Sequence, residues 1–226
     1  MSYYKIKNLE EYFKHYKKSV REPRKFWEKV ASENFTWYQE WDKVVDFNMA
    51  EAEIKWFTNA KVNIVKNCID RHLAKKGDKT AIIFEPNDPT EQALHITYNE
   101  LHERVCKMAN VLKEQGIEKG DRVCIYLPMI PELAISILAC ARIGAIHSVI
   151  FAGFSASAVN SRINDSQCKM VITSDGGYRG NKTIDLKSIV DEALLNSPSV
   201  KNVLVVKRIN TDIDMKEGRD QWLQPL

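Results

Sequence analysis

The chain has 226 residues, 44% of them hydrophobic and 28% charged, with a formal net charge of +3. This composition is typical of a globular protein and excludes a disordered chain, and so balanced a charge gives no reason to expect binding to nucleic acid or to a membrane surface. No apolar run reaches the ~18 residues that span a bilayer, and the amino terminus lacks the apolar core of a signal peptide. We therefore expect a cytoplasmic protein.

The cysteines and histidines give no indication of a metal or redox site. The five cysteines are widely spaced among apolar residues, and no two have the two-residue spacing of zinc or redox motifs. We expect reduced, buried thiols that act as small hydrophobic side chains. The five histidines lack ligand spacing and no catalytic triad can be assembled, so no catalytic or metal-binding residue is predicted. The cysteines are Cys68, Cys106, Cys124, Cys140 and Cys168.

Residues 1–76 are predicted to form a helical and irregular amino-terminal segment. They contain four of the five tryptophans. Apolar residues with helical spacing occur over 9–20 and again over 62–73, and Pro23 suits the first turn of a helix between them. We expect the Trp and Phe side chains to pack as a lid on another domain. The alternative is that they stack on a ligand.

From residue 77 onward, strands and helices alternate. The expected strands are apolar without period-2 alternation, which is typical of strands buried on both faces of a sheet. The sequence therefore predicts an α/β fold over residues 77–226, with a mostly parallel sheet flanked by helices. The polar stretch over 210–226 has no helix after it, so we expect a truncated domain. Strands are expected at 80–84, 95–98, 123–127, 146–151, 170–173 and 203–206, and helices at 99–115, 131–142, 155–165 and 186–195.

Two loops follow strands at the edge where parallel sheets bind ligands. In the first, over 151–155, Gly153 would let the backbone approach a ligand closely, and Phe151 and Phe154 would offer faces on which an aromatic base could stack. The alternative is a tight turn with Phe154 packed in the core. Taken alone, the residues of this loop favour the tight turn.

The second loop, over 175–182, contains three glycines together with Arg179 and Lys182. Glycine leaves backbone N–H groups free to point at an anion, arginine and lysine suit phosphate oxygens, and the helix that follows would add its positive end. These features indicate a phosphate-bearing ligand; the alternative is a solvated loop without one. The spacing fits neither a Walker A loop nor Gly-x-Gly-x-x-Gly, which argues against a P-loop ATPase and a dinucleotide fold.

Segments that run in order along the chain carry a resemblance to a known family. They include Asn-Cys-Ile-Asp-Arg-His-Leu at 67–73, Tyr-Leu-Pro-Met-Ile-Pro-Glu-Leu at 126–133, Phe-Ala-Gly-Phe-Ser at 151–155 and Asp-Gly-Gly-Tyr-Arg at 175–179. Together they resemble the amino-terminal part of AMP-forming acetyl-CoA synthetases, the acetate–CoA ligases of the adenylate-forming superfamily. The resemblance covers nearly the whole chain. It implies an amino-terminal segment of this family over 1–76 and the first part of its AMP-binding domain over 77–226.

The resemblance also implies an activity and a site. The family's enzymes convert acetate, ATP and CoA to acetyl-CoA, AMP and pyrophosphate through an acetyl-adenylate. Segment 151–153 would lie near the adenine of CoA, and segment 179–182 would hold its 3′-phosphate, in agreement with the phosphate interpretation of that loop. The residues assigned to the CoA site in this way are Phe151, Ala152, Gly153, Arg179, Gly180, Asn181 and Lys182.

Two departures from the family pattern bear on CoA affinity. Family members commonly have a second glycine where Ala152 stands, and often arginine where Lys182 stands. Lysine keeps the charge but loses bidentate hydrogen bonding. CoA binding is therefore expected to be weaker at this position.

The other functional parts of the family lie further along its chain, including the loop that grips ATP phosphates, the site of Mg²⁺, the acetate pocket and a mobile domain with a catalytic lysine. We therefore expect a fragment that holds part of the CoA site, lacks the adenylation machinery and is inactive alone. Its partners would be small molecules, namely CoA, ATP or AMP, and acetate. The alternatives are a fragment of a propionate– or acetoacetate–CoA ligase, a stand-alone module that binds CoA or a nucleotide, and a remnant without a ligand.

Overall fold

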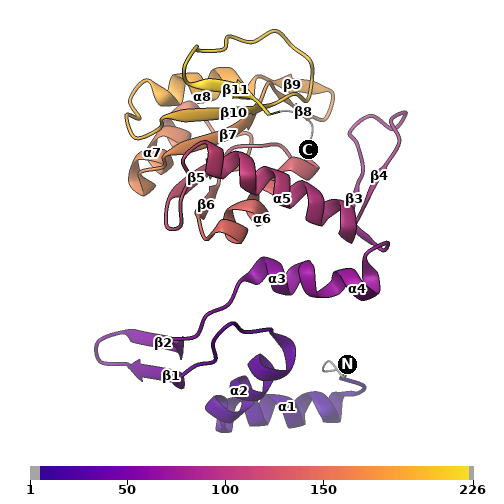
Figure 1. The fold of residues 1–226 in the computed structure, drawn as a ribbon, viewed down its shortest axis with the longest axis vertical. Helices are drawn as coiled ribbons and strands as arrows, with labels where there is room; N and C mark the ends of the chain where they lie inside the picture. The colour runs from indigo at the N-terminus through magenta and orange to yellow at the C-terminus, as the bar shows by residue number, and fades with distance from the viewer. Residues whose placement is uncertain (1–5, 224–226) are drawn as a thin grey trace. The chain divides into compact units, whose positions relative to one another are not determined.

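The computed structural model describes residues 6–223, which divide into two compact units with the boundary between Asn67 and Cys68 (Figure 1). Both units contain helices and strands, and the larger one carries the sheet that the sequence predicts. Within residues 6–223, no helix combines the length and the apolar character that crossing a bilayer requires.

The first unit begins with two helices. α1 (Leu9–Arg21) starts at Asn8, whose side chain accepts a hydrogen bond from the backbone N–H of Glu11. α2 (Pro23–Asn34) has its proline in the first turn, where the missing N–H costs nothing. Both helices agree with the helical segment that the sequence predicts.

A β-hairpin follows, where the sequence analysis expects irregular structure. β1 (Lys43–Asn48) and β2 (Glu53–Thr58) are antiparallel, and charged residues alternate with apolar ones in the first half of β2. Trp37 and Trp41 precede this hairpin and Phe57 belongs to β2, and the centroids of the three rings are 4.9 to 5.4 Å apart. These aromatic side chains therefore pack against one another within the first unit.

The helix expected over 62–73 is broken into short pieces. α3 (Ile64–Cys68), a 3₁₀ turn (Asp70–His72) and α4 (Leu73–Lys76) follow one another. The carboxylate of Asp70 accepts a hydrogen bond of 2.5 Å from Nη2 of Arg142. This contact with a distant part of the second unit holds the turn, and no local sequence pattern encodes it.

The second unit contains a five-stranded parallel sheet, as the sequence predicts. Its strand order is β11-β10-β7-β5-β6. The chain thus moves from β5 outward to β6, returns past β5 to β7, and continues to β10 and β11. A topological switch therefore lies between β5 and β7, and ligands of such sheets bind beyond the strand ends at this point. The strands are β5 (Arg122–Ile125), β6 (Ile146–Val149), β7 (Met170–Ser174), β10 (Asn202–Val206) and β11 (Asp220–Trp222).

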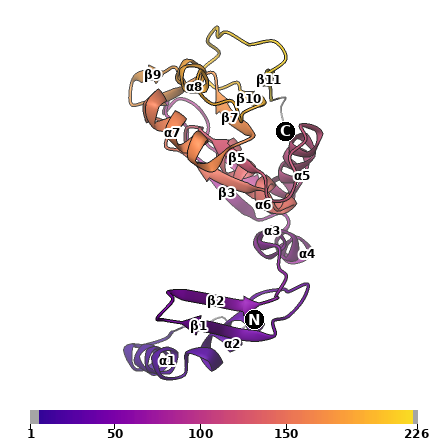
Figure 2. The same ribbon diagram turned by 90° about the vertical axis from the view of Figure 1, so that its left-hand side faces the viewer.

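Helices cover both faces of this sheet (Figures 1 and 2). α5 packs with α6 on one face, and α7 packs with α8 on the other. Successive strand residues point to opposite faces, so Cys124 and Val171 join the core under α7 and α8 while Val123 and Met170 point the other way, all of them fully buried. Because the strands are buried on both faces of the sheet, apolar and polar residues do not alternate along them. The helices are α5 (Tyr98–Glu114), α6 (Pro131–Ile143), α7 (Ala156–Ser166) and α8 (Leu186–Leu194).

Two short hairpins lie outside the main sheet. β3 (Thr80–Phe84) pairs with β4 (Leu94–Thr97), and β8 (Gly177–Arg179) pairs with β9 (Lys182–Ile184). The first hairpin leads directly into α5 through a capping box, in which Thr97 and Glu100 each bind the other's backbone N–H. Both hairpins contribute to the candidate site described below.

Three of the five cysteines are buried, and the expectation of buried thiols is wrong for the others. Burial raises the pKa of the thiols of Cys124, Cys140 and Cys168, that of Cys140 to about 12. Cys106 is only half-buried. Cys68 is exposed, because it ends a helix of five residues whose buried side is formed by others. All five thiols are free.

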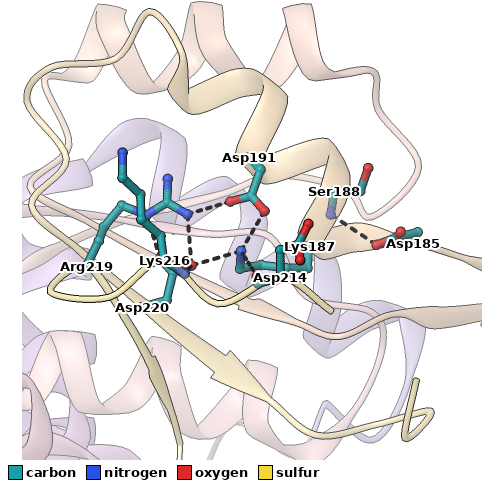
Figure 3. Close-up of polar contacts among 8 residues, drawn as sticks. All are labelled: Asp185, Lys187, Ser188, Asp191, Asp214, Lys216, Arg219 and Asp220. Carbon is teal, nitrogen blue, oxygen red and sulfur yellow. Dashed lines mark hydrogen bonds and ion pairs between the residues drawn. The ribbon is translucent and has the colours of Figure 1, made fainter. Parts of the chain in front are cut away.

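The fifth strand, β11, lies in the polar tail, where the sequence analysis expects no strand. It pairs with β10 and begins at Asp220. The carboxylate of Asp220 is fully buried and lies 2.9 Å from Nζ of Lys187 (Figure 3). Arg219 and Asp191 complete the network, so two cations face two carboxylates. Burial alone would raise the pKa of Asp220, but hydrogen bonds from Arg219 and Lys187 keep that pKa below its ordinary value. Each of the four charged groups in this network therefore has a partner of opposite charge.

Replacing Lys187 with methionine tests whether this network stabilises the unit. The substitution keeps an unbranched side chain that is one atom shorter and leaves two carboxylates facing one cation. We expect the free energy of unfolding to fall by about 3 kcal/mol, and the melting temperature by roughly 6–12 °C in thermal unfolding. Lys113→Met, at an exposed position of α5, is the control and should change stability by less than about 0.5 kcal/mol. Equal melting temperatures for the two variants would show that the network contributes nothing.

Candidate functional site

A cavity of about 550 Å³ opens at the carboxyl edge of the parallel sheet. Segments that follow β5, β6, β7 and β10 share its wall, because parallel strands end at a common edge. The β3–β4 hairpin supplies the rest of the lining. The lining residues after the strands are Leu127–Ile130, Leu133, Val149–Ala152, Tyr178, Arg179 and Arg208, and those from the hairpin are Phe84, Glu85 and Asn87.

The loop over 151–155 presents an exposed aromatic side chain. Phe151 lines the cavity and is 60% exposed, and its ring meets that of Phe154 edge-on, with centroids 5.9 Å apart. A side chain at Gly153 would lie 3.0 Å from the Phe151 ring, so the glycine makes room for that ring. The segment does form a tight turn, because the backbone N–H of Phe154 donates a hydrogen bond of 3.1 Å to the backbone oxygen of Phe151. The packing of Phe154 in the core is wrong, however, since Phe154 is 38% exposed with the guanidinium of Arg162 over its ring.

A hydrogen bond from Tyr126 fixes this loop. Its hydroxyl donates a hydrogen bond of 2.8 Å to the backbone oxygen of Phe154. Burial raises the pKa of the Tyr126 phenol, which therefore stays a neutral donor. Ser155 then caps α7 by accepting a hydrogen bond from the backbone N–H of Ala158.

The glycine-rich stretch over 175–182 forms a hairpin rather than an open loop. Arg179 and Lys182 are direct partners in the antiparallel register of β8 and β9. Side chains of directly opposed residues lie on the same face of such a pair, so the two cations stand side by side. Gly180 forms the turn between them with a φ of 59°, a backbone conformation that favours glycine.

The two cations on this hairpin have no internal partners. Within residues 6–223, the side chains of Arg179 and Lys182 make no hydrogen bond or ion pair. The expectation that the positive end of α8 contributes to anion binding is wrong, however. Asp185 caps that helix by accepting a hydrogen bond from the backbone N–H of Ser188, so a carboxylate already occupies the position.

The seven residues assigned to the CoA site by resemblance do not all line one cavity. Phe151, Ala152 and Arg179 line the cavity at the sheet edge. Gly180 and Asn181 line a neighbouring cavity of about 400 Å³, which shares Tyr178 and Asn87 with the first. Gly153 and Lys182 belong to the same two segments without lining either cavity.

The buried carboxylate of Asp175 ties two of the site's segments together. It accepts hydrogen bonds from the backbone N–H groups of Gly176, Arg208, Ile209 and Asn210 at 2.7 to 3.2 Å. The first of these groups precedes the β8–β9 hairpin, and the other three follow β10. Asp175 therefore fixes the base of the hairpin relative to Arg208.

Asp175→Asn should destabilise the second unit. An amide has one acceptor oxygen where the carboxylate has two, so at least one buried N–H group loses its partner. We expect a loss of about 2–3 kcal/mol in the free energy of unfolding, measured by chemical denaturation. Asp212→Asn, at an exposed position in the same part of the chain, should stay within about 0.5 kcal/mol of the original protein. A loss as small in Asp175→Asn would mean that these hydrogen bonds are dispensable.

Sequence reasoning missed Arg208 and Asn87 as parts of the site. Arg208 follows an apolar strand, so the only local signal was its place after β10 at the ligand-binding edge. Asn87 lies in a turn whose residues indicate a change of chain direction and nothing more. Among residues 6–223, no three His, Cys, Asp or Glu side chains gather in a way that could hold a metal ion.

Comparison with known proteins agrees with the resemblance seen in the sequence. Residues 12–68 match the family described as acetyl-coenzyme A synthetase N-terminus, and residues 69–224 match the family described as AMP-binding enzyme. The acetyl-coenzyme A synthetase of Alkalilimnicola ehrlichii is 53% identical over 92% of this chain, and that of Magnetococcus marinus is 49% identical over 95%. The chain spans 32% and 33% of these two proteins, about a third of each.

A solved structure extends the comparison to the fold. Acetoacetyl-CoA synthetase from Streptomyces lividans superimposes with a TM-score of 0.82 at 26% identity. The match covers 90% of this chain and 31% of that one. The parallel sheet with helices on both faces is therefore also found in a protein named as an acetoacetyl-CoA synthetase.

Proposed function

Since the chain belongs to the family of AMP-binding enzymes, we propose that it forms the amino-terminal part of an acetate–CoA ligase and contributes part of that enzyme's CoA site. The enzyme would convert acetate, ATP and CoA to acetyl-CoA, AMP and pyrophosphate. The identity of about half with acetyl-coenzyme A synthetases supports acetate over acetoacetate, because the acetoacetyl-CoA synthetase is only 26% identical.

The observation that carries this proposal is the pair of unpartnered cations on the β8–β9 hairpin. Arg179 and Lys182 stand on one face of it, and neither side chain is neutralised by a carboxylate within residues 6–223. The 3′-phosphate of CoA carries close to two negative charges and would accept charge-assisted hydrogen bonds from both. An arginine fork and a neighbouring lysine suit such a group.

Phe151 is the proposed platform for the adenine of CoA. Three aromatic side chains line the cavity, namely Phe84, Phe151 and Tyr178. The guanidinium of Arg208 lies over the rings of Phe84 and Tyr178, which occupies a face of each. Phe151 has only an edge contact with Phe154 and is 60% exposed, so it is the ring best suited to stack on a base.

Calorimetric titration with CoA and with 3′-dephospho-CoA tests the phosphate site. We expect CoA to bind about tenfold more tightly or better, since a charge-assisted hydrogen bond contributes roughly 1.5–3 kcal/mol. Arg179→Gln should remove most of this preference while leaving the affinity for dephospho-CoA unchanged. Lys182→Arg should increase the preference, because arginine adds bidentate hydrogen bonding.

Lys207→Gln is the control for the change in net charge, because Lys207 is exposed and does not line the cavity. It should leave both affinities within about twofold of the original protein. Equal affinity of the original protein for CoA and for dephospho-CoA would refute the phosphate site.

We further propose that the 226-residue chain does not adenylate acetate by itself. Adenylation needs metal ions and several positive groups around the transferring phosphates. Residues 6–223 contain no cluster of carboxylates or histidines suited to a metal ion. In the presence of acetate, ATP and Mg²⁺, we expect pyrophosphate release at the background rate, measured by a coupled assay. Acetyl-adenylate formed above background by the purified chain would overturn this proposal.

A further inference from the structure

Arg208 occupies an unusual place between two aromatic rings of the site. Its guanidinium carbon lies 5.3 Å from the ring centroid of Tyr178 and 5.7 Å from that of Phe84. Both distances are within the range of a cation–π interaction. Tyr178 belongs to the β8–β9 hairpin and Phe84 to the β3–β4 hairpin, so one side chain from a third segment contacts both hairpins.

One hydrogen bond joins the two hairpins directly, and one ion pair joins Arg208 to the β3–β4 hairpin. Asn87 donates a hydrogen bond of 2.8 Å from its side-chain nitrogen to the backbone oxygen of Gly180. Nη1 of Arg208 lies 3.9 Å from a carboxylate oxygen of Glu91, which closes the arrangement from the side of the β3–β4 hairpin. The backbone of Arg208 is itself held, because its N–H donates to the buried carboxylate of Asp175 at 2.7 Å.

These contacts hold the residues on either side of Arg179. Tyr178 precedes Arg179 and is covered by Arg208, while Gly180 follows Arg179 and accepts the hydrogen bond from Asn87. The side chain of Arg179 makes no hydrogen bond or ion pair within residues 6–223, so only its neighbours determine where it points. A three-residue strand with a two-residue turn has little intrinsic stability and needs such support.

We infer that Arg208 is a positioning residue, which acts with the β3–β4 hairpin as a clasp that fixes the β8–β9 hairpin and thereby the direction in which Arg179 meets an anion. The inference rests on the proposed function only for the identity of that anion, the 3′-phosphate of CoA. Arg208 does not need to touch the phosphate. Its planar guanidinium is the feature that covers two rings at once, which a lysine cannot reproduce.

Four variants separate this role from a loss of charge and from direct binding. Arg208→Gln removes the cation and the stacking plane, and Arg208→Lys keeps the charge without the plane. Asn87→Ala removes the contact with Gly180 at an exposed position and leaves every charge in place. Lys207→Gln changes the net charge as Arg208→Gln does, one residue away. Thermal unfolding of each variant establishes that it is folded.

The first measurement is the ratio of the affinities for CoA and 3′-dephospho-CoA, obtained by calorimetry. Arg208→Gln should lower this ratio about tenfold, Arg208→Lys by less, and Asn87→Ala about threefold. Simple destabilisation would lower the apparent affinity for both ligands together and leave the ratio unchanged. A loss of affinity for both ligands by the same factor would overturn the positioning role; in a variant with an unchanged melting temperature it would indicate that Arg208 contacts a part of the ligand common to both.

The second measurement needs no ligand. Amide hydrogen exchange over residues 177–184 should become about fivefold faster in Arg208→Gln and in Asn87→Ala, and should not change in Lys207→Gln. Unchanged exchange in both clasp variants would overturn the inference. Faster exchange in the two variants, together with an original protein that does not prefer CoA over dephospho-CoA, would leave the clasp in place and refute the proposed function instead.

Discussion

The candidate site depends on one constraint, which is that parallel strands end at the same edge of their sheet. Because β5, β6, β7 and β10 run in one direction, the segments that follow them meet around a single cavity. Asp175 then sets the relation between two of these segments through one carboxylate that accepts hydrogen bonds from four backbone N–H groups. The base of a hairpin with two three-residue strands is fixed at this edge by these hydrogen bonds.

Buried and surface cations differ in whether carboxylates lie next to them. Lys187 is almost fully buried and faces two carboxylates, because an unpaired charge in the protein interior costs several kcal/mol. Arg179 and Lys182 have no such partners among residues 6–223, and on a water-exposed hairpin a cation can remain unpaired at little cost. The difference separates a lysine that supports the sheet from two cations available to an anion.

Arg208 shares features with the buried cation and with the two surface cations. It is charged, yet its guanidinium is largely enclosed by aromatic rings and lies near the carboxylate of Glu91. It covers one face of Phe84 and one of Tyr178, while Phe151 is more exposed than Tyr178. The same contacts therefore bear on both parts of the proposed CoA site, the surface for a base and the cations for a phosphate. The chain spans about a third of the length of the related synthetases.

The sequence by itself determined the fold class and most of the helices and strands of the second unit, because continuous apolar runs and helical spacing are local properties. It also indicated the family, since the resembling segments are contiguous, and it pointed to 151–153 and 179–182 as segments that follow strands. Only the tertiary structure decided that β11 joins the sheet, that Arg179 and Lys182 share one face, and that Arg208 lies against Tyr178. Each of these features depends on contacts between residues distant in the chain or on the register of a hairpin. No local pattern of charge or hydrophobicity specifies such contacts.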